Sequence, residues 1–199
     1  KHYLHRRFPM TNKVLDVYVG FDTREPEAYR VCTQSLTRHA SCPVRLFPLV
    51  QSELRDMRLY WREFASGRDR GVVIDKSDGR PFSTEFAFTR FLVPHLQQSG
   101  WALFCDCDFL YLADIRELFD LMDDRYAVRV VKHDYRPNEK FKMDGQPQRT
   151  YNRKNWSSFC LWNCSHPLNK TLTPEIINKQ SGRWLHGFSW LKDDEIGGL

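Results

Sequence analysis

The sequence predicts an α/β domain with a mostly parallel central sheet flanked by helices. Three observations support this fold class. Apolar, β-branched runs alternate along the chain with segments of helical periodicity. The run at 101–105, Trp-Ala-Leu-Phe-Cys, is apolar at successive positions, which is typical of a parallel strand buried on both faces. The length of 199 residues suits one domain with a substantial core.

The predicted strands are short apolar runs that end at turn residues. The first, at 14–19, is followed by Gly20. The others are expected at 44–50, 72–74 (a short piece), 101–105, 126–132 and 158–162. We found no internal repeat or linker, so we expect a flexible lead-in at 1–13 and a single domain at 14–199.

Five helices are expected between these strands. The first lies within 21–40, where Asp22 and Thr23 are cap candidates and Pro26 suits a first turn. Asp114, with Glu117 three residues later, forms a variant of the capping box that opens another. The remaining helices are predicted at 53–64, with an apolar stripe of Leu54, Met57, Trp61 and Phe64, at 84–98, bent at Pro94, and at 173–180. The polar segment 136–154 is predicted to be a long functional loop.

Charge and composition narrow the classes of partner. The net charge of +5 fits an anionic small ligand, and no Lys/Arg block exceeds the His-Arg-Arg at 5–7. The sequence therefore gives no indication of a stripe of basic residues that would bind nucleic acid. No apolar segment approaches the ~20 residues that cross a bilayer, and the first ten residues lack the apolar stretch of a secretion signal.

Six cysteines could form three disulfides, but their placement favours free thiols. Cys105 and Cys107 flank Asp106 and are too close in an extended chain to pair. Cys32 lies on a helix face and Cys160 in a strand, where cysteine behaves as a small apolar residue. We therefore expect a reducing compartment and a cytoplasmic protein.

Asp106 and Asp108 follow the central strand with one residue between them. In open α/β sheets, ligands bind at the carboxyl ends of the strands. Two carboxylates ~4 Å apart repel by about 4 kcal/mol at an effective dielectric of about 20, and a cation between them removes that cost. Hard oxygen ligands suit Mn²⁺ or Mg²⁺ bridged to a substrate phosphate.

Two other interpretations of the pair stay open. The aspartates could be solvated turn residues. The pair could also belong to a phosphatase of the haloacid dehalogenase type, although Phe109, Leu110 and Tyr111 are bulkier than that motif prefers.

The segment FSTEFAFTRFLVPHLQQSGWALFCDCDFLYLADIRELF (82–119) resembles the core of metal-dependent nucleotide-sugar glycosyltransferases of the GT-A fold, especially glycosyltransferase family 8 and its bacterial relatives. The resemblance rests on the order of four features, which are a helix with an arginine, a strand, the D-x-D motif and the D-I-x-E-L-F segment. It extends to VGFD at 19–22 and to YNRKNWSSFCLWNC at 151–164.

This resemblance implies a GT-A-like fold and a donor site. Val19, Gly20, Phe21 and Asp22 would meet the nucleoside, although Asp22 could also simply cap the first helix. Arg90 would reach the base or the diphosphate, unless it is a surface helix arginine. Asp106 would bind the ribose and the metal, and Asp108 the metal, with Mn²⁺ or Mg²⁺ as cofactor.

The later residues are placed by the same resemblance. Asp193 and Asp194 resemble the acidic pair beside the transferred sugar and are the catalytic candidates. His186 is a candidate metal ligand. In the relatives the histidine ligand lies further on, in a segment before a Gly-Gly-Pro-Trp-like motif, and this sequence stops at the Gly-Gly-Leu of 197–199, so the domain could be truncated. Candidates for the sugar or acceptor pocket are Lys142, Asp144, Gly145, Arg153, Lys154, Asn155 and Ser157.

The resemblance implies a hexosyltransferase that moves a sugar from a nucleoside diphosphate donor, UDP being expected, to an unknown glycan, lipid or protein acceptor with retention. Two alternatives are a nucleotide- or sugar-binding module without turnover and the phosphatase.

Overall fold

The structure is a computed structural model that describes residues 13–67, 72–133 and 153–199. The predicted lead-in, except for Lys13, and most of the predicted loop lie outside these ranges. The assignment of 14–199 to a single domain stays a prediction.

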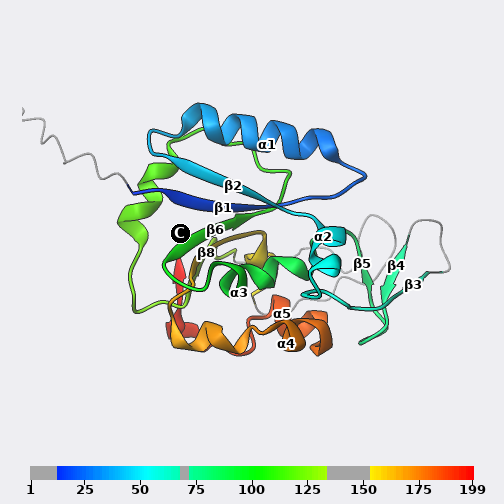
Figure 1. Ribbon diagram of the computed structural model, residues 1–199. Helices are drawn as coiled ribbons and strands as arrows, with labels where there is room; N and C mark the ends of the chain where they lie inside the picture. Colours follow the sequence, from blue (N-terminus) through cyan, green and yellow to red (C-terminus); the bar gives the residue numbers. More distant parts are fainter. Residues whose placement is uncertain (1–12, 68–71, 134–152) are drawn as a thin grey trace, which may run out of the picture.

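A six-stranded sheet forms the centre of the molecule (Figure 1). Its order is β2 (Val44–Leu49), β1 (Leu15–Gly20), β6 (Trp101–Cys105), β8 (Phe159–Asn163), β7 (Val128–Val130) and β9 (Ile196–Gly198). Only β8 runs opposite to its neighbours, and the other strands of this sheet share one direction. The predicted fold class, with a mostly parallel sheet, is therefore confirmed.

Helices cover both faces of this sheet (Figure 1). α1 (Pro26–His39) lies on one face and buries Cys32 and Leu36. α3 (Val93–Gln97), α4 (Pro174–Lys179) and α5 (Gly182–His186) lie on the other. All six residues of β1 are buried, as are the last four of β6, so the core continues through the middle of the sheet.

The predicted helix at 53–64 is wrong. α2 spans only Gln51–Asp56, and Arg58 then adopts a positive φ of 57° that ends it. Met57 and Trp61, expected in an apolar stripe, are exposed, and Phe64 begins a strand. Tertiary packing overrides the helical period here, because Phe64 pairs with Asp75 in a second sheet.

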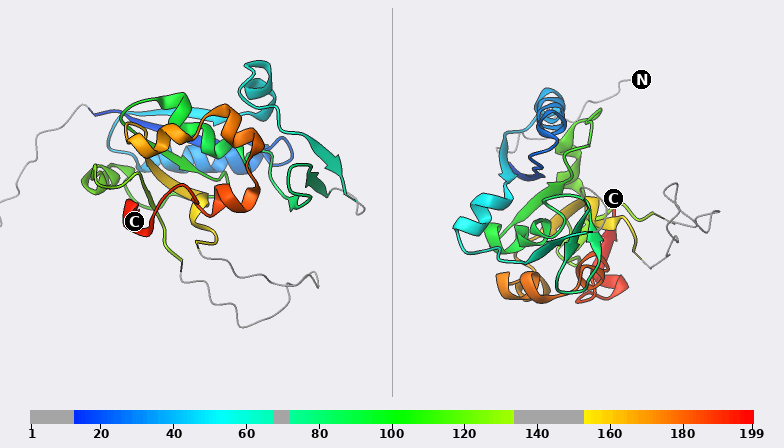
Figure 2. Two further views of the ribbon diagram at one scale, coloured as in Figure 1. Left: turned by 90° about the horizontal axis from the view of Figure 1, so that it is seen from below. Right: turned by 90° about the vertical axis from the view of Figure 1, so that its right-hand side faces the viewer.

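This second sheet is small and antiparallel, and it projects from one end of the molecule beyond α2 (Figure 2). Its strands are β3 (Phe64–Ser66), β4 (Val73–Asp75) and β5 (Pro81–Phe82). The apolar piece expected at 72–74 is therefore a strand of this sheet rather than of the central one.

The predicted helix at 84–98 is also interrupted. A 3₁₀ turn, η1 (Thr89–Leu92), leads into α3, where Pro94 occupies the first turn rather than bending a longer helix. Asp114 does cap a helix, accepting from the Arg116 amide, but the element is 3₁₀. The helix capped by Asp114 is η2 (Ile115–Leu121), and the other 3₁₀ helices of the described chain are η3 (Trp156–Ser158), η4 (Pro167–Thr171) and η5 (Asp193–Glu195).

A buried ion pair joins the small sheet to the helical layer. The guanidinium of Arg62 donates to both carboxylate oxygens of Asp75, and both side chains are 1% exposed. The same guanidinium donates to the Ile177 carbonyl of α4 at 2.7 Å and lies 4.0 Å from the Phe88 ring centroid. This contact network fixes β4 against α4.

Arg62→Met is expected to lower the free energy of unfolding by about 3–5 kcal/mol, because it leaves the Asp75 charge buried without its partner. Guanidinium chloride titrations followed by circular dichroism measure the change. Lys76→Met, at the exposed Lys76–Glu63 pair, is the control and should change it by less than about 1 kcal/mol. Equal midpoints for the two variants would contradict a stabilising role for the buried pair.

All six cysteines fall within the described ranges, and all are free, as predicted. Cys32 and Cys105 approach to 4.0 Å between sulfur atoms without bonding. Over the same ranges, the structure contains no helix whose length and hydropathy would let it cross a bilayer.

Candidate functional site

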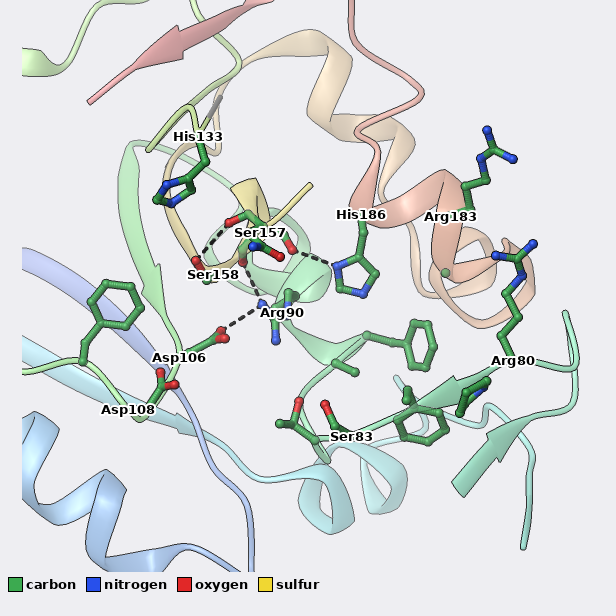
Figure 3. A pocket seen from close by; sticks show the side chains of 18 of the residues that line it. Arg80, Ser83, Arg90, Asp106, Asp108, His133, Ser157, Ser158, Arg183 and His186 are labelled. Carbon is green, nitrogen blue, oxygen red and sulfur yellow. Dashed lines mark hydrogen bonds and ion pairs between the residues drawn. The ribbon is translucent and has the colours of Figure 1, made fainter. Parts of the chain in front are cut away.

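A cavity of about 820 Å³ opens beside the carboxyl end of β6 (Figure 3). Its walls come from five parts of the described chain: the β4–β5 turn and the segment after it, the segment after β6, the segment after β7, the residues around η3, and α5. The lining residues are Asp78, 80–84, Ala87, Phe88, Arg90, Asp106, 108–110, His133, Asn155, Ser157, Ser158, Gly182, Arg183 and His186.

Both aspartates of the D-x-D motif border this cavity. β6 ends at Cys105, and the Asp106 amide donates to the Ser158 carbonyl at 2.9 Å, which holds the turn beside β8. Asp106 is half-buried, with 19% of its side chain exposed, whereas Asp108 is exposed. The strand-end position that the sequence predicts for the pair is therefore the position that it takes.

Arg90 reaches the cavity from η1 and is buried rather than lying on the surface of a helix. Its Nη1 lies 2.8 Å from Asp106 Oδ1 and donates to the Ser157 carbonyl at 2.8 Å. The guanidinium carbon lies about 5 Å from two ring centroids, 5.3 Å for Phe86 and 5.1 Å for Phe104. The alternative of a surface arginine is wrong, because packing places this charge next to the first aspartate.

One carboxylate oxygen of Asp106 receives no hydrogen bond from the described part of the chain. The Arg90 contact is close enough for an ion pair but lacks hydrogen-bond geometry, so Oδ1 has no hydrogen-bond donor among the described residues. The pKa of Asp106 is raised to about 6, mainly by burial and also by the Asp108 charge, while the Arg90 charge acts in the opposite direction. A carboxylate in this state gains from a bound cation.

The two aspartates fit a hard cation that arrives with its substrate. Mg²⁺ and Mn²⁺ are commonly held by one or two carboxylates, with substrate phosphates and water completing the shell. Within the described ranges, no group of three or more acidic, histidine or cysteine side chains is arranged to hold a metal. Asp106 and Asp108 are the described carboxylates at the end of β6 that could hold such a cation.

His186 lies in the cavity wall, where its Nδ1 is 2.7 Å from the hydroxyl of the buried Ser157 (Figure 3). Its ring packs edge-on against Phe91, with centroids 5.2 Å apart. Burial, together with the nearby Arg90 and Arg62 charges, lowers the pKa of His186 to about 3. In the described part of the chain, His186 does not join the aspartates as a third metal ligand.

The neutral imidazole of His186 predicts a loss of stability in acid. In the unfolded chain, His186 binds a proton below its ordinary pKa of about 6.5, whereas the folded protein resists protonation down to about 3. The contribution of the neutral His186 to the free energy of unfolding is therefore fully present above about pH 6.5 and is lost as the pH falls towards 3.

Between pH 7.5 and pH 5, wild type should lose about 1–2 kcal/mol more than His186→Gln. Urea midpoints at the two pH values measure the difference. His39→Gln, on the exposed end of α1, is the control and should behave as wild type. If His186→Gln has the same pH dependence as wild type, the histidine is not held neutral.

The segment 19–22 lies beside the cavity and does not line it. Val19 and Gly20 are buried at the end of β1, and Phe21 packs against Tyr29. A Cβ on Gly20 would lie 2.5 Å from the Phe86 ring, so glycine is required for this packing. Since Phe86 also contacts Arg90, Gly20 supports the site through a shared ring.

Asp22 is fully buried and does not cap α1, whose N-cap is Glu25. Its carboxylate accepts from the Arg24 amide and side chain and from the Glu85 amide at 3.1 Å. The hydrogen bonds from Arg24 lower the pKa of Asp22. Arg24 also donates to the Ser83 carbonyl, so this pair holds the wall at 83–85.

Of the site residues predicted in the second half of the sequence, some line the cavity and others lie on the surface. Ser157 and Asn155 line the cavity, and Lys154 is close in sequence but is not part of the lining. Asp193 and Asp194 are exposed in η5, outside the lining, and Asp193 pairs with Arg153 at 2.6 Å. Lys142, Asp144 and Gly145 lie outside the described residues. The catalytic role of Asp193 and Asp194 stays a prediction.

Several lining residues were missed by the sequence analysis. Arg80 follows a turn of the small sheet, Arg183 lies in α5, and His133 follows β7. No motif or spacing marks them, because the small sheet and α5 meet only in the folded chain.

Comparison with solved structures identifies the fold as GT-A-like. The glycosyltransferase GlyE of Streptococcus pneumoniae TIGR4 is 15% identical, with a TM-score of 0.52 over 94% of this chain and 45% of its own. The bifunctional glycosyltransferase WbbM is 16% identical, with a TM-score of 0.58 over 96% of this chain and 40% of its own. The chain thus spans less than half of either protein.

Comparison of sequences gives a much nearer relative. No family model matches the chain. Protein CDI of Arabidopsis thaliana is 54% identical over 188 residues, which cover 94% of this chain and 67% of the relative. At that identity and coverage, the chain belongs to the same protein family as Protein CDI.

Proposed function

We propose that this protein transfers a sugar from a nucleoside diphosphate donor, UDP, to a glycan, lipid or protein acceptor. The observation that carries the proposal is that Asp106, Asp108 and Arg90 share one cavity at the carboxyl end of the central strand. The glycosyltransferase neighbours have the same fold, and the D-x-D series resembles family 8. Hexosyl transfer with retention is part of the proposal and rests on that resemblance.

Each of these side chains would have a separate role in binding the donor. Asp106 and Asp108 would hold Mn²⁺ or Mg²⁺ against the diphosphate. The cation, when bound, withdraws charge from the departing nucleoside diphosphate. Arg90 keeps Asp106 in place through the 2.8 Å contact and adds a positive charge next to it. The Ser157–His186 hydrogen bond fixes the opposite wall.

Calorimetry with UDP in the presence and absence of Mn²⁺ tests the donor site. Micromolar binding that requires Mn²⁺ and is abolished by a chelator is expected. Release of UDP from UDP-sugars, and the anomeric proton of the product by NMR, then test turnover and retention. If UDP does not bind either with or without Mn²⁺, the proposed function is incorrect.

A binding module without turnover is the second candidate. It is favoured by the position of Asp193 and Asp194, which are exposed and outside the cavity lining. UDP binding without product, over a panel of donors and acceptors, would favour this candidate. The phosphatase alternative is not supported, because it requires a haloacid dehalogenase fold rather than the GT-A-like fold.

A reducing compartment such as the cytoplasm is also proposed. The support is that all six cysteines are free and five of them are buried. Fractionation of a tagged full-length protein tests the location.

A further inference from the structure

The end of the cavity opposite the two aspartates carries two arginines, Arg80 and Arg183 (Figure 3). Figure 3 shows the aspartates on one side of the cavity and the side chains of Arg80 and Arg183 on the other, with Arg90 and His186 between them. The two aspartates of the motif therefore lie at one end of the cavity and the two arginines at the other.

Neither guanidinium is neutralised within the described chain. The side chains of Arg80 and Arg183 are exposed, and the hydrogen bonds and ion pairs of the described residues leave both without a partner. Arg90, the other arginine of the described cavity lining, is buried and paired with Asp106. Among the lining residues that the structure describes, Arg80 and Arg183 are therefore the arginines open to a ligand.

One carboxylate holds the two arginine-bearing segments together. Asp78 Oδ1 accepts from the Arg80 amide at 3.0 Å, and Asp78 Oδ2 accepts from the Gly182 amide, next to Arg183, at 2.9 Å. The β4–β5 turn and the start of α5 are thereby joined through main-chain amides. Asp78 brings the arginines together without using their guanidinium groups.

The wall beside these arginines is aromatic. Phe82 and Phe88 meet edge to face, with ring centroids 5.2 Å apart, and both line the cavity. Phe88 is backed by the neutralised Arg62–Asp75 pair, which fixes the ring. Apolar rings next to a few placed polar groups are typical of small-molecule sites, here with room for a sugar ring.

We propose that Arg80 and Arg183 form a subsite for a carboxylate or phosphate group carried by the transferred sugar or by the acceptor. Guanidinium groups bind such anions through paired hydrogen bonds, which neutral sugars cannot match. The inference rests on the proposed function and adds the chemical class of its substrate, an acidic sugar or acidic acceptor.

Paired ligands that differ in one group test the subsite. UDP-glucuronate and UDP-glucose, compared by calorimetry with Mn²⁺, probe an anion on the donor. Glucuronate and glucose, compared by ligand-observed NMR with and without UDP, probe an anion on the acceptor. The wild-type protein should bind the acidic member of at least one pair with a dissociation constant about tenfold lower than that of the neutral member. A difference of this size corresponds to about one hydrogen bond to a charged group.

The preference should fall about threefold or more in Arg80→Gln and in Arg183→Gln and should disappear in the double variant. Arg38→Gln, at the exposed end of α1, removes the same charge far from the cavity and should keep the full preference. Equal binding of both members of each pair by wild type, or a preference that the double variant retains, would overturn the subsite.

Failure of the subsite and failure of the proposed function are distinguishable. Binding of UDP with Mn²⁺ but without an acidic preference leaves the transferase proposal standing and rejects the subsite. If UDP does not bind, the measurements with free glucuronate and glucose still decide whether the arginines select an anion.

Discussion

Asp108→Ala is expected to reduce Mn²⁺-dependent donor turnover by about 100-fold or more, while leaving stability near that of wild type. Asp108 is exposed on the cavity, so its removal costs little packing. It does remove one of two carboxylates available to the cation. Loss of one electrostatic contact to the developing charge commonly costs two to three orders of magnitude, about 10²–10³.

The Asp108 variant is measured as UDP release over a series of Mn²⁺ concentrations, with thermal unfolding as the check on folding. Asp56→Asn, at the exposed end of α2, is the matched control for loss of a surface carboxylate. If Asp108→Ala keeps wild-type turnover and the same Mn²⁺ dependence, the proposed metal role of the motif is incorrect.

Arg90→Met is expected to have a second large effect, on both stability and donor binding. The Arg90 guanidinium contacts Asp106 and the Ser157 carbonyl, each at 2.8 Å, and packs on Phe86 and Phe104. Methionine keeps part of the apolar contact but leaves Asp106 without its positive partner. We expect a loss of about 2–3 kcal/mol in stability, since the pair is largely buried, and about 100-fold weaker binding of UDP.

Arg90→Lys separates charge from geometry. Lysine keeps the positive charge, but a single ammonium group cannot make both the Nη1 contacts with Asp106 and Ser157 and the Nε hydrogen bond to the Phe86 carbonyl. It should recover most of the stability and only part of the UDP affinity. Arg38→Met, on the surface of α1, controls for the change of residue type. Wild-type UDP affinity in Arg90→Met would show that Arg90 serves the fold alone.

The central sheet could be predicted from sequence because its signals are local. β1, β2 and β6 appear at or within a residue or two of the predicted runs, since buried parallel strands carry continuous apolar residues. The position of the D-x-D motif follows from the same argument. The Asp114 cap was also predicted, because a capping side chain acts on amides two or three residues away.

The helices at 53–64 and 84–98 were mispredicted because non-local contacts overrode their apolar spacing. Phe64 pairs across the small sheet with Asp75 instead of joining a helical stripe. Thr89–Leu92 winds as a 3₁₀ turn, and this places Arg90 beside Asp106 and Ser157, which is 67 residues away in sequence.

The sequence alone determined the fold class, the strand that ends at Cys105, next to Asp106, and the acidic character of the motif, because each depends on residues close together in the chain. Only the tertiary structure decided that Arg90 is buried, that Asp22 supports a wall instead of capping α1, and that Arg80 and Arg183 share a cavity with the aspartates. These outcomes depend on contacts between distant segments, and no local pattern encodes which charges become neighbours when the sheet and its helices pack.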